Sequence, residues 1–579
     1  MKNIKNFPNK IDSKLVNEKL LLSSKFIESK KFNIAINILE DLDKKFSEIP
    51  EVIYNFALSY YNEGVRFFNN KYYQISLQYL KNAELYFEKI KNKDFLFDVY
   101  IKLSICNRKE NNYFEVLKYH KKLFKLDNKS DFTLSLLMYS KQKLADWEGI
   151  EKLFEKAKIR LDEKVSSLTP FSSLLLSDDL NVQLKSATNY SKAYINSKNK
   201  HSFHHLERTR RKKIKVAFLS ADFYEHATLY LIAGVFEKLN HNDFDYSAIS
   251  YAEKSDDSII FQRVKKSFAN FYLLNDKTDQ EIAEFLYELE IDIVIDLKGH
   301  TKNNRIGILK NKPCPIQISY LGYPGTLGTD FIDYLILDKF IVNDENRKYF
   351  SENIIFLPNS YQCNDDNKPK LIDLKRKDFN LPEDKFILCS LNNGQKYNKN
   401  ILNVWIGILK KNANTVLWII NDPGVKENVL KYMHDSGIEK SRIILSPRVD
   451  YNLHISRLAL ADLFIDSFPC NAHTTASDAL YANLPIITVS GKSMASRVTG
   501  SLLSVIKLNH LICKDFEEYY TKINFYINSQ IELKILKKYI KDNKFILYDS
   551  EVFARNLEKS FTKVWQNYLD NKTYKDIII

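Results

Sequence analysis

One short segment combines residue types that suit a diphosphate. The segment DSFPCNAHTTASDAL follows the apolar run LFI and leads into an expected helix through Thr474 and Thr475. A helix N-terminus presents unpaired N–H groups and the positive end of its dipole, so it attracts an anion. His473 adds a hydrogen-bond donor, and Asp478 lies within reach of a ribose hydroxyl. The same residues also suit an ordinary capped helix start, because Thr is a common N-cap and Asp is common in a first turn.

A second segment, SLNNGQKYNKN, places amides and Lys396 between an expected strand and an expected helix. A lysine held there can neutralise a departing diphosphate while a glycosidic bond breaks, which is electrostatic catalysis of the leaving group. A lysine that only keeps the surface soluble would have the same spacing. Both interpretations stay open from the spacing alone.

A third segment, SADFYEHATLYL, places Asp222 and His226 between the apolar run VAFLS and an apolar helix. An imidazole at a strand end can accept a hydroxyl proton or orient an acceptor, because its usual pKa lies near the operating pH. A single histidine is more often structural. The segments DLKGHTKNNR and LGYPGTLG add polar turns after two further strands, where glycine allows a ligand to approach the backbone closely.

The first 165 residues are expected to form helices. They contain almost no glycine or proline, and their apolar residues recur three and four positions apart. Aromatic residues open the second helix of each expected pair, at Phe32, Tyr73, Phe114 and Trp147. Only the last interval is close to the ~34-residue tetratricopeptide period. Stacked repeats of this kind make a surface for extended peptide, and the alternative is a helical cap that only supports the next domain.

From residue 213 onward, short apolar runs alternate with helical segments, which is the pattern of α/β domains with mostly parallel sheets. We expect a helical bridge and linker over 166–212, a first Rossmann-like domain over 213–375, and a second over 376–579 that includes terminal helices. Such sheets bind ligands outside the carboxyl ends of their strands, so two facing domains form a cleft for a nucleotide and a second substrate. The candidate residues all follow expected strands.

Composition excludes several classes of protein. The net charge of +14 over 579 residues comes from lysines spread along the chain, which indicates a compositional bias more than a nucleic-acid surface. No run approaches the ~20 apolar residues of a membrane span, and the N-terminus lacks the apolar block of a secretory signal. The six scattered cysteines show no zinc-ligand spacing. These features predict a cytoplasmic protein with free thiols.

Together these segments resemble the protein O-GlcNAc transferase family, including bacterial relatives similar to the plant SPINDLY protein. The similarity runs from about Leu168 to Leu569, and its motifs occur in the same order: SADFYEHAT, DLKGHTK, LGYPGT, SLNN before Lys396, RIILSP, LADLFID, CNAHTTASD and ASRV. The resemblance implies a GT-B fold of two Rossmann-like domains behind tetratricopeptide-like repeats. It implies an inverting glycosyltransferase that uses no metal or other cofactor and moves a sugar, N-acetylglucosamine in this family, from a UDP-sugar to Ser or Thr hydroxyls of proteins.

The resemblance also implies roles for individual residues. His226 is implied to accept the proton of the attacking hydroxyl, and Asp222 or a phosphate oxygen of the donor stays as an alternative. Lys396 is implied to contact the diphosphate. The implied UDP-binding set is Asn393, Lys396, Val449, Tyr451, His454, Arg457, His473, Thr474, Thr475 and Asp478. The implied set on the sugar or acceptor side is Thr228, Lys302, Gly322 and Pro324.

The chain also departs from the family pattern. Gln395 stands where the family often has a tyrosine, Tyr451 where the animal enzymes have a lysine near the uracil, and Asn393 where they have a glutamine. The large domain that animals insert between the two halves has no room here. We therefore expect a different sugar pocket and an intact diphosphate site. No carboxylate pair suggests a metal site, because the acidic run around Asp365 lies in the expected interdomain linker.

Several alternatives remain at this stage. The chain can be a protein N-glycosyltransferase or a transferase of another UDP-hexose, since relatives of this architecture use different acceptors. It can also be a helical-repeat scaffold whose transferase half has lost catalysis, although His226, Lys396, His473 and Asp478 are all present. A UDP-sugar epimerase shares the two-domain layout but has no use for a peptide-binding arm. The expected partners are a UDP-sugar and an acceptor protein, without nucleic acid.

Overall fold

The computed structural model describes residues 10–46, 48–195, 203, 212–253 and 256–579. The chain forms two compact units, Met1–Leu144 and Ala145–Ile579. The end of the predicted linker, just before residue 212, lies mostly outside the described residues. Within the described ranges, no helix combines the length and the apolar character needed to cross a membrane. All six cysteines are buried, free thiols, as expected from their spacing.

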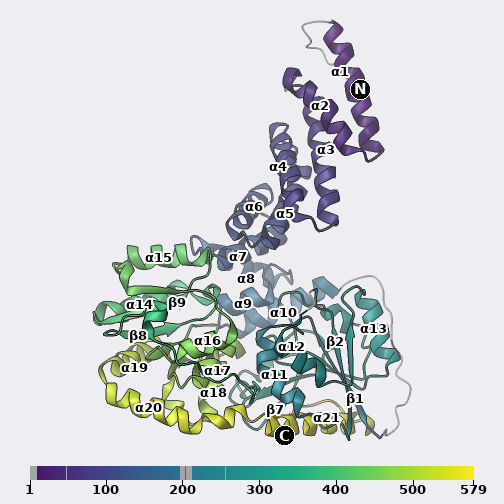
Figure 1. Cartoon of the computed structure of the whole chain (residues 1–579). Coiled ribbons are helices and arrows are strands. Elements are labelled where there is room, and N and C mark those ends of the chain that lie inside the picture. Colours follow the sequence, from purple (N-terminus) through teal and green to yellow (C-terminus); the bar gives the residue numbers. More distant parts are fainter. Residues whose placement is uncertain (1–9, 47, 196–202, 204–211, 254–255) are drawn as a thin grey trace. The chain divides into compact units, whose positions relative to one another are not determined.

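The first unit consists of helices that pack on their neighbours in the chain, which confirms the predicted helical repeat region (Figure 1). Its helices are α1 (Lys10–Glu28), α2 (Phe32–Phe46), α3 (Pro50–Asn69), α4 (Tyr73–Lys89), α5 (Lys93–Lys109), α6 (Tyr113–Leu126) and α7 (Asp131–Lys143). Small residues allow the close crossing of α3 and α4. A Cβ atom on Gly64 would lie 2.8 Å from Cγ of Leu80, and Ser76 Oγ donates to the Gly64 carbonyl at 2.9 Å.

The second unit begins with three helices that connect to both α/β domains: α8 (Ile150–Asp162), α9 (Pro170–Leu176) and α10 (Leu180–Ile195). Trp147, ahead of α8, donates through Nε1 to the Tyr397 carbonyl at 3.3 Å in the second domain. Asp178, between α9 and α10, accepts from the Lys492 N–H at 2.7 Å. Ser191 of α10 donates to the carbonyl of Leu327 at 2.8 Å in the first domain. The bridge therefore holds the two domains together.

The first α/β domain contains an eight-stranded sheet in the order β14-β7-β6-β5-β4-β1-β2-β3, and its paired strands are parallel. The strands are β1 (Ile214–Ser220), β2 (Phe244–Ser250), β3 (Asn270–Leu273), β4 (Ile293–Asp296), β5 (Ile316–Ser319), β6 (Tyr334–Asp338), β7 (Asn353–Leu357) and β14 (Ile577–Ile578). The intervening helices include α11 (Ala227–Glu237), α12 (Ile259–Lys266) and α13 (Asp279–Glu288). The strand order reverses between β1 and β4, which is where doubly wound sheets bind ligands.

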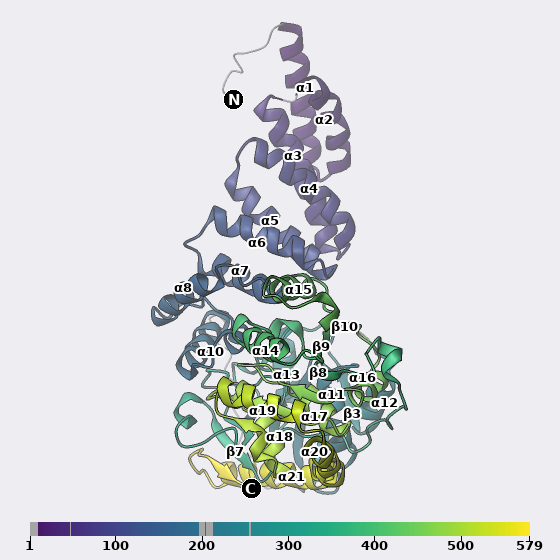
Figure 2. The ribbon, with the colours of Figure 1, turned by 90° about the vertical axis from the view of Figure 1, so that its left-hand side faces the viewer.

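The second α/β domain contains a six-stranded parallel sheet in the order β10-β9-β8-β11-β12-β13. Its strands are β8 (Phe386–Ser390), β9 (Thr415–Ile420), β10 (Ile443–Ser446), β11 (Leu463–Ile465), β12 (Ile486–Val489) and β13 (Ile512–Cys513). Its helices are α14 (Lys399–Lys411), α15 (Val425–Asp435), α16 (Tyr451–Leu458), α17 (Thr474–Tyr481), α18 (Val498–Val505), α19 (Phe516–Asn528) and α20 (Gln530–Asn543). Helices α14 and α19 pack on each other beside the sheet (Figure 2). Here the strand order reverses between β8 and β11.

The last part of the chain returns to the first domain. Helix α21 (Ser550–Leu569) places Ala554, Leu557 and Phe561 in the same hydrophobic core as Phe218 of β1. Strand β14 then pairs with β7 at the edge of the first sheet, and Figure 1 shows α21, in yellow, beside β1 and β7. The last helix and strand of the predicted second domain, residues 376–579, thus pack with the first α/β domain.

We expect acid to destabilise the second unit partly through His300. Its Nε2–H donates to the Leu327 carbonyl at 2.8 Å, and burial lowers its pKa from 6.5 to about 4. Below pH 6.5 the unfolded chain binds more protons than the native chain, so stability falls as the pH drops from 6.5 towards 4.

The substitution His300→Gln should remove up to about 2 kcal/mol of the stability difference between about pH 7.5 and about pH 5, measured by urea unfolding. An unchanged pH dependence in this variant would show that His300 does not titrate as its burial implies.

Candidate active site

The first domain holds a buried ion pair where its strand order reverses. Asp222 follows β1 and Lys298 follows β4. The Lys298 Nζ donates to Asp222 Oδ2 at 2.7 Å, and the two side chains are only 4% and 6% exposed. Charges buried this deeply require a partner, because an unpaired charge in the interior is very costly. Lys298 therefore belongs with the predicted Asp222. It was not among the predicted residues, and its position directly after a strand, within DLKGHTK, was the signal that could have found it.

His226 lies beside this pair at the start of α11. Its Nδ1 accepts from the Thr228 N–H at 3.2 Å, which caps the helix, and lies 3.5 Å from Asp222 Oδ2. Burial lowers the pKa of His226 below 6.5, while Asp222 opposes this shift and Lys298 adds to it. Among the described residues, no hydrogen bond reaches Nε2. The lowered pKa makes the ring mostly neutral at pH 7, and because Nδ1 accepts from Thr228, the ring hydrogen is on Nε2.

The other residues predicted on the sugar side have different surroundings. A Cβ atom on Gly322 would overlap the carbonyl oxygen of Leu297, so this glycine allows two backbone segments to touch just before Lys298. Pro324 is buried nearby in the chain, and Lys302 is exposed on the turn after β4. Their contacts with a sugar remain predictions.

Part of the predicted UDP-binding set lies where the strand order of the second domain reverses, between β8 and β11. Lys396 closes the short 3₁₀ helix η4 (Gly394–Lys396) after β8, and its Nζ donates to the Asn471 carbonyl at 2.5 Å after β11. Asn393 is exposed, and its Oδ1 accepts from the Gln395 N–H at 3.3 Å. Lys396 thus reaches across from one strand end to the other.

The N-terminus of α17 lies at the same place. His473 occupies its N-cap position without a capping hydrogen bond from its side chain. The first-turn N–H groups around Thr474 and Thr475 are thus not capped by that ring, which suits an anion. The His473 Nε2–H donates to the Ala495 carbonyl at 3.3 Å. Burial, with a contribution from nearby Lys396, lowers the pKa of His473 to about 3, so its ring is neutral at pH 7.

His454 and Arg457 form a hydrogen-bonded pair on α16, the helix that begins at the predicted Tyr451. Arg457 is 1% exposed, and its Nη2 donates to His454 Nδ1 at 2.8 Å. Burial lowers the pKa of Arg457 to about 10 and that of His454 to about 4. Neutral His454 therefore carries its hydrogen on Nε2, where it can donate to a carbonyl oxygen. Val449 lies partly buried before the helix.

Asp478 belongs to a buried cluster that includes a residue from the interdomain linker, which is the segment 358–385 between β7 and β8. Lys368 Nζ donates to Asp478 Oδ1 at 2.8 Å, and the Tyr451 hydroxyl donates to the same oxygen at 2.8 Å. Burial beside Asp478 raises the pKa of Tyr451 well above 10, so its hydroxyl keeps its proton. The Tyr451 ring stacks on Tyr230 of α11, with centroids 3.6 Å apart. This stack packs α11, the helix that His226 caps, against the side of the second domain that is predicted to bind UDP.

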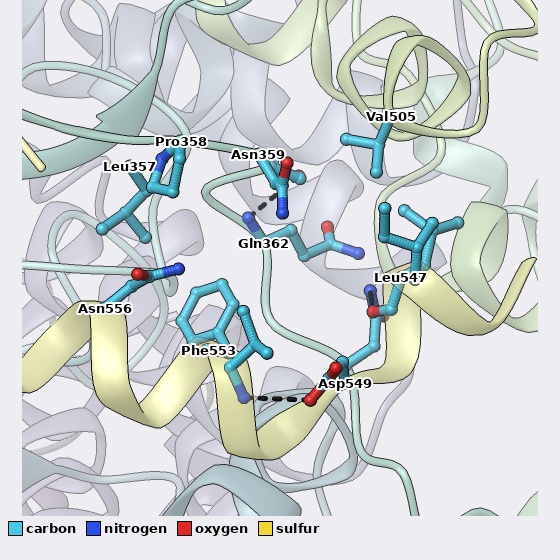
Figure 3. A pocket seen from close by; sticks show the side chains of 13 residues that line it. Leu357, Pro358, Asn359, Gln362, Val505, Leu547, Asp549, Phe553 and Asn556 are labelled. Carbon is cyan, nitrogen blue, oxygen red and sulfur yellow. Dashed lines mark hydrogen bonds between the residues drawn. The ribbon is translucent and has the colours of Figure 1, made fainter.

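A separate cavity of about 270 Å³ lies where the linker, α18, the 3₁₀ helix η8 (Lys544–Tyr548) and α21 meet (Figure 3). Phe553 and Asn556 of α21 and Gln362 of the linker line it. None of the predicted site residues does. The Gln362 Nε2 donates to Ser477 Oγ at 2.5 Å, which ties the wall of the cavity to α17.

Within the described ranges, no group of three or more His, Cys, Asp or Glu side chains could hold a metal ion. The acidic run in the linker has a structural partner, because Arg263 Nη1 donates to Asp365 Oδ2 at 2.8 Å.

The sequence and the fold are similar to known glycosyltransferases. The profile of glycosyl transferase family 41 matches residues 150–369 and 362–557. A probable UDP-N-acetylglucosamine–peptide N-acetylglucosaminyltransferase, SEC of Arabidopsis thaliana, is 34% identical over 366 residues, 61% of this chain and 37% of that protein. A second relative from Arabidopsis thaliana, SPINDLY, is also named a probable UDP-N-acetylglucosamine–peptide N-acetylglucosaminyltransferase. It is 27% identical over 61% of this chain and 40% of its own length. This chain thus matches about two fifths of each relative.

The solved structure of a mutant O-GlcNAc transferase from Thermobaculum terrenum superposes with a TM-score of 0.68 and 17% identity. It covers 98% of this chain and 100% of its own. At this identity the likeness concerns the fold, and it confirms the expected helical repeats followed by the two domains of a GT-B fold.

We expect Lys298→Met to lower the free energy of unfolding by about 3–5 kcal/mol, because it leaves the buried Asp222 carboxylate without its partner. Adding Asp222→Asn should restore much of the loss, since no unpaired charge then remains. Urea unfolding of both variants measures the effect.

The matched control is Lys431→Met, which removes an ion pair with Asp435 whose side chains are 73% and 55% exposed. It should change stability by less than about 1 kcal/mol. Equal effects of the two lysine substitutions would contradict the buried pairing.

Proposed function

Because the chain belongs to glycosyl transferase family 41, we propose that it transfers a sugar, N-acetylglucosamine, from a UDP-sugar to Ser or Thr hydroxyls of proteins. The observation that carries this proposal is the meeting of Lys396 with the N-terminus of α17 at the strand reversal of the second domain. This is the place where doubly wound folds bind nucleotides. The proposed setting is the cytoplasm.

UDP is proposed to lie along the second domain. Its diphosphate binds between Lys396 and the first turn of α17, where an ammonium and the first-turn N–H groups both favour negative charge. Its uracil faces His454, whose Nε2–H is available because Arg457 occupies Nδ1. Its ribose lies beside Tyr451 and Asp478.

The reaction is proposed to be a single displacement. A Ser or Thr oxygen bonds to the anomeric carbon while the bond from that carbon to the UDP oxygen breaks, so configuration inverts. The electron pair of the broken bond stays on the diphosphate, where Lys396 and the helix dipole stabilise it. This stabilisation comes from protein cations, which supports catalysis without a bound metal.

His226 is proposed to take the proton of the attacking hydroxyl on Nε2. For this, the ring hydrogen has to move to Nδ1, which lies 3.5 Å from Asp222 Oδ2. Asp222 then stabilises the imidazolium that forms, and Lys298 keeps Asp222 in place at 2.7 Å. The shift gives up the hydrogen bond from the Thr228 N–H, which costs about 1 kcal/mol.

The helical unit is proposed to hold the acceptor polypeptide, as stacked helical repeats commonly do. The alternatives are distinguished by the acceptor and the donor. A protein N-glycosyltransferase would modify Asn, and a transferase of another UDP-hexose would add a different mass. A scaffold without catalysis would bind UDP-sugar and transfer nothing.

Transfer can be tested with a panel of UDP-sugars, host lysate as acceptor and a chelator present throughout. We expect a gain of N-acetylhexosamine mass on Ser or Thr. The substitution Lys396→Ala should lower the rate by about 100-fold or more, because the leaving group loses its cation. Peptide mass spectrometry and UDP release measure both effects.

Lys410→Ala is the matched control, because Lys410 is exposed in the last turn of α14. Its rate should equal that of the natural chain. Activity that disappears with the chelator and returns with a divalent metal would contradict the proposed stabilisation by protein cations.

The pH dependence tests His226. A base must be neutral, and burial lowers the pKa of His226 from 6.5, so the acid limb of kcat/KM should be centred below pH 6.5. His226→Ala should abolish most activity and this acid limb. An acid limb centred above pH 6.5 would exclude His226 as the base.

A further inference from the structure

We infer that Lys368, in the linker between the two α/β domains, is a positioning residue for recognition of the ribose of the donor. This inference rests on the proposed function, because it concerns the Asp478 end of the same UDP site. Lys368 precedes β8, the first strand of the second domain, and its side chain reaches α17 of that domain.

The surroundings of Lys368 are specialised for one buried ammonium group. Its side chain is 1% exposed and that of Asp478 is 3% exposed. Lys368 Nζ donates to the Tyr451 oxygen at 2.6 Å and to Asp478 Oδ1 at 2.8 Å. The rings of Tyr451, Tyr481 and Tyr548 have centroids 5.3, 5.8 and 5.9 Å from Nζ. A lysine is therefore held by a carboxylate, a hydroxyl and three aromatic rings, all of which favour a cation.

This arrangement fixes two groups that a ribose would meet. Within the described residues, the hydrogen bonds to the Asp478 carboxylate both end on Oδ1, from Lys368 and Tyr451. Oδ2 is thus the oxygen left to accept from a ribose hydroxyl. The Tyr451 ring is partly exposed and its hydroxyl contacts Asp478, so its position also shapes the entrance. Lys368 holds both groups at once.

Loss of the ammonium would change the chemistry of Asp478. A carboxylate that is 3% exposed and has no cation beside it either takes up a proton or moves towards water. Each change spoils it as an acceptor for ribose hydroxyls. The effect should therefore concern those hydroxyls specifically, because Lys396 and His454 are proposed to contact other parts of UDP.

The interdomain linker also contacts Ser477, the residue before Asp478 on α17. Gln362 Nε2 donates to Ser477 Oγ at 2.5 Å, next to Asp478, and the Tyr548 hydroxyl donates to the Ser477 carbonyl at 2.5 Å. Gln362 and Lys368 of the linker thus contact the consecutive residues Ser477 and Asp478 of α17. Of these two, Lys368 is the one that brings a charge to the Asp478 side chain, which separates its role from general support of the helix.

The test compares the binding of UDP with that of 2′,3′-dideoxy-UDP, which lacks both ribose hydroxyls, by isothermal titration calorimetry. The natural chain should bind UDP at least about tenfold more tightly, because a hydrogen bond to a charged group contributes that much. In Lys368→Met the ratio of the two dissociation constants should fall towards one. The affinity for the dideoxy compound should not change, whereas a merely structural defect would weaken both ligands.

Lys544→Met is the matched control. Lys544 is also a buried lysine near the Tyr481 ring, but it donates to Asn483 Oδ1 instead of Asp478. This variant should keep the natural ratio. If Lys368→Met does not fold, Lys368→Gln serves as a milder variant, since it keeps a hydrogen-bond donor near Asp478 and removes the charge. It should lower the ratio part of the way.

The outcomes separate this inference from the proposed function. A natural ratio in Lys368→Met or in Lys368→Gln overturns the positioning role while leaving UDP binding intact. A natural chain that binds neither nucleotide overturns the proposed function and this inference together. A natural chain that binds both equally shows that its site does not recognise the ribose hydroxyls, which overturns the inference alone.

Discussion

A parallel sheet covered on both faces leaves little room for polar side chains except at the ends of its strands. Both sheets of this protein obey that constraint, with buried strands such as β4 and β8 that carry almost only apolar residues. Where the strand order reverses, the helices on the two sides diverge and the strand ends become accessible. Asp222 and Lys298 lie at one reversal, and Lys396 and Asn471 at the other. These two reversals place the charged groups of the candidate site, and α16, which follows β10 at the sheet edge, adds His454 and Arg457.

Much of this arrangement could be predicted from the sequence. The apolar runs predicted the strands, and the rule that ligands bind after strands pointed to Asp222, His226 and Lys396. The change from helical spacing to alternating α/β segments predicted a helical region followed by α/β domains. The repeat family was harder to identify, because the helices of the first unit differ in length and most intervals exceed one standard repeat.

The sequence did not predict the residues whose importance depends on distant partners. Lys298 and Lys368 resemble many other lysines in a chain with a net charge of +14. Only the fold shows that each is buried against a carboxylate 76 or 110 residues away. The return of α21 was likewise invisible, because an amphipathic pattern shows that a helix packs on something but not on which sheet. Local patterns define elements, whereas long-range contacts decide burial and charge.

The return of α21 means that the chain crosses between the two α/β domains twice. The crossings lie side by side, since Asn364 Nδ2 donates to the Leu547 carbonyl at 3.1 Å and the Asp366 N–H donates to Ser550 Oγ at 3.1 Å. A single connection would allow one domain to swivel on the other. Two adjacent connections define a line, and rotation about that line is the motion that strains neither. The bridge helices α8–α10 also contact both domains, so bending about this line would have to break contacts such as that between Asp178 and the Lys492 N–H.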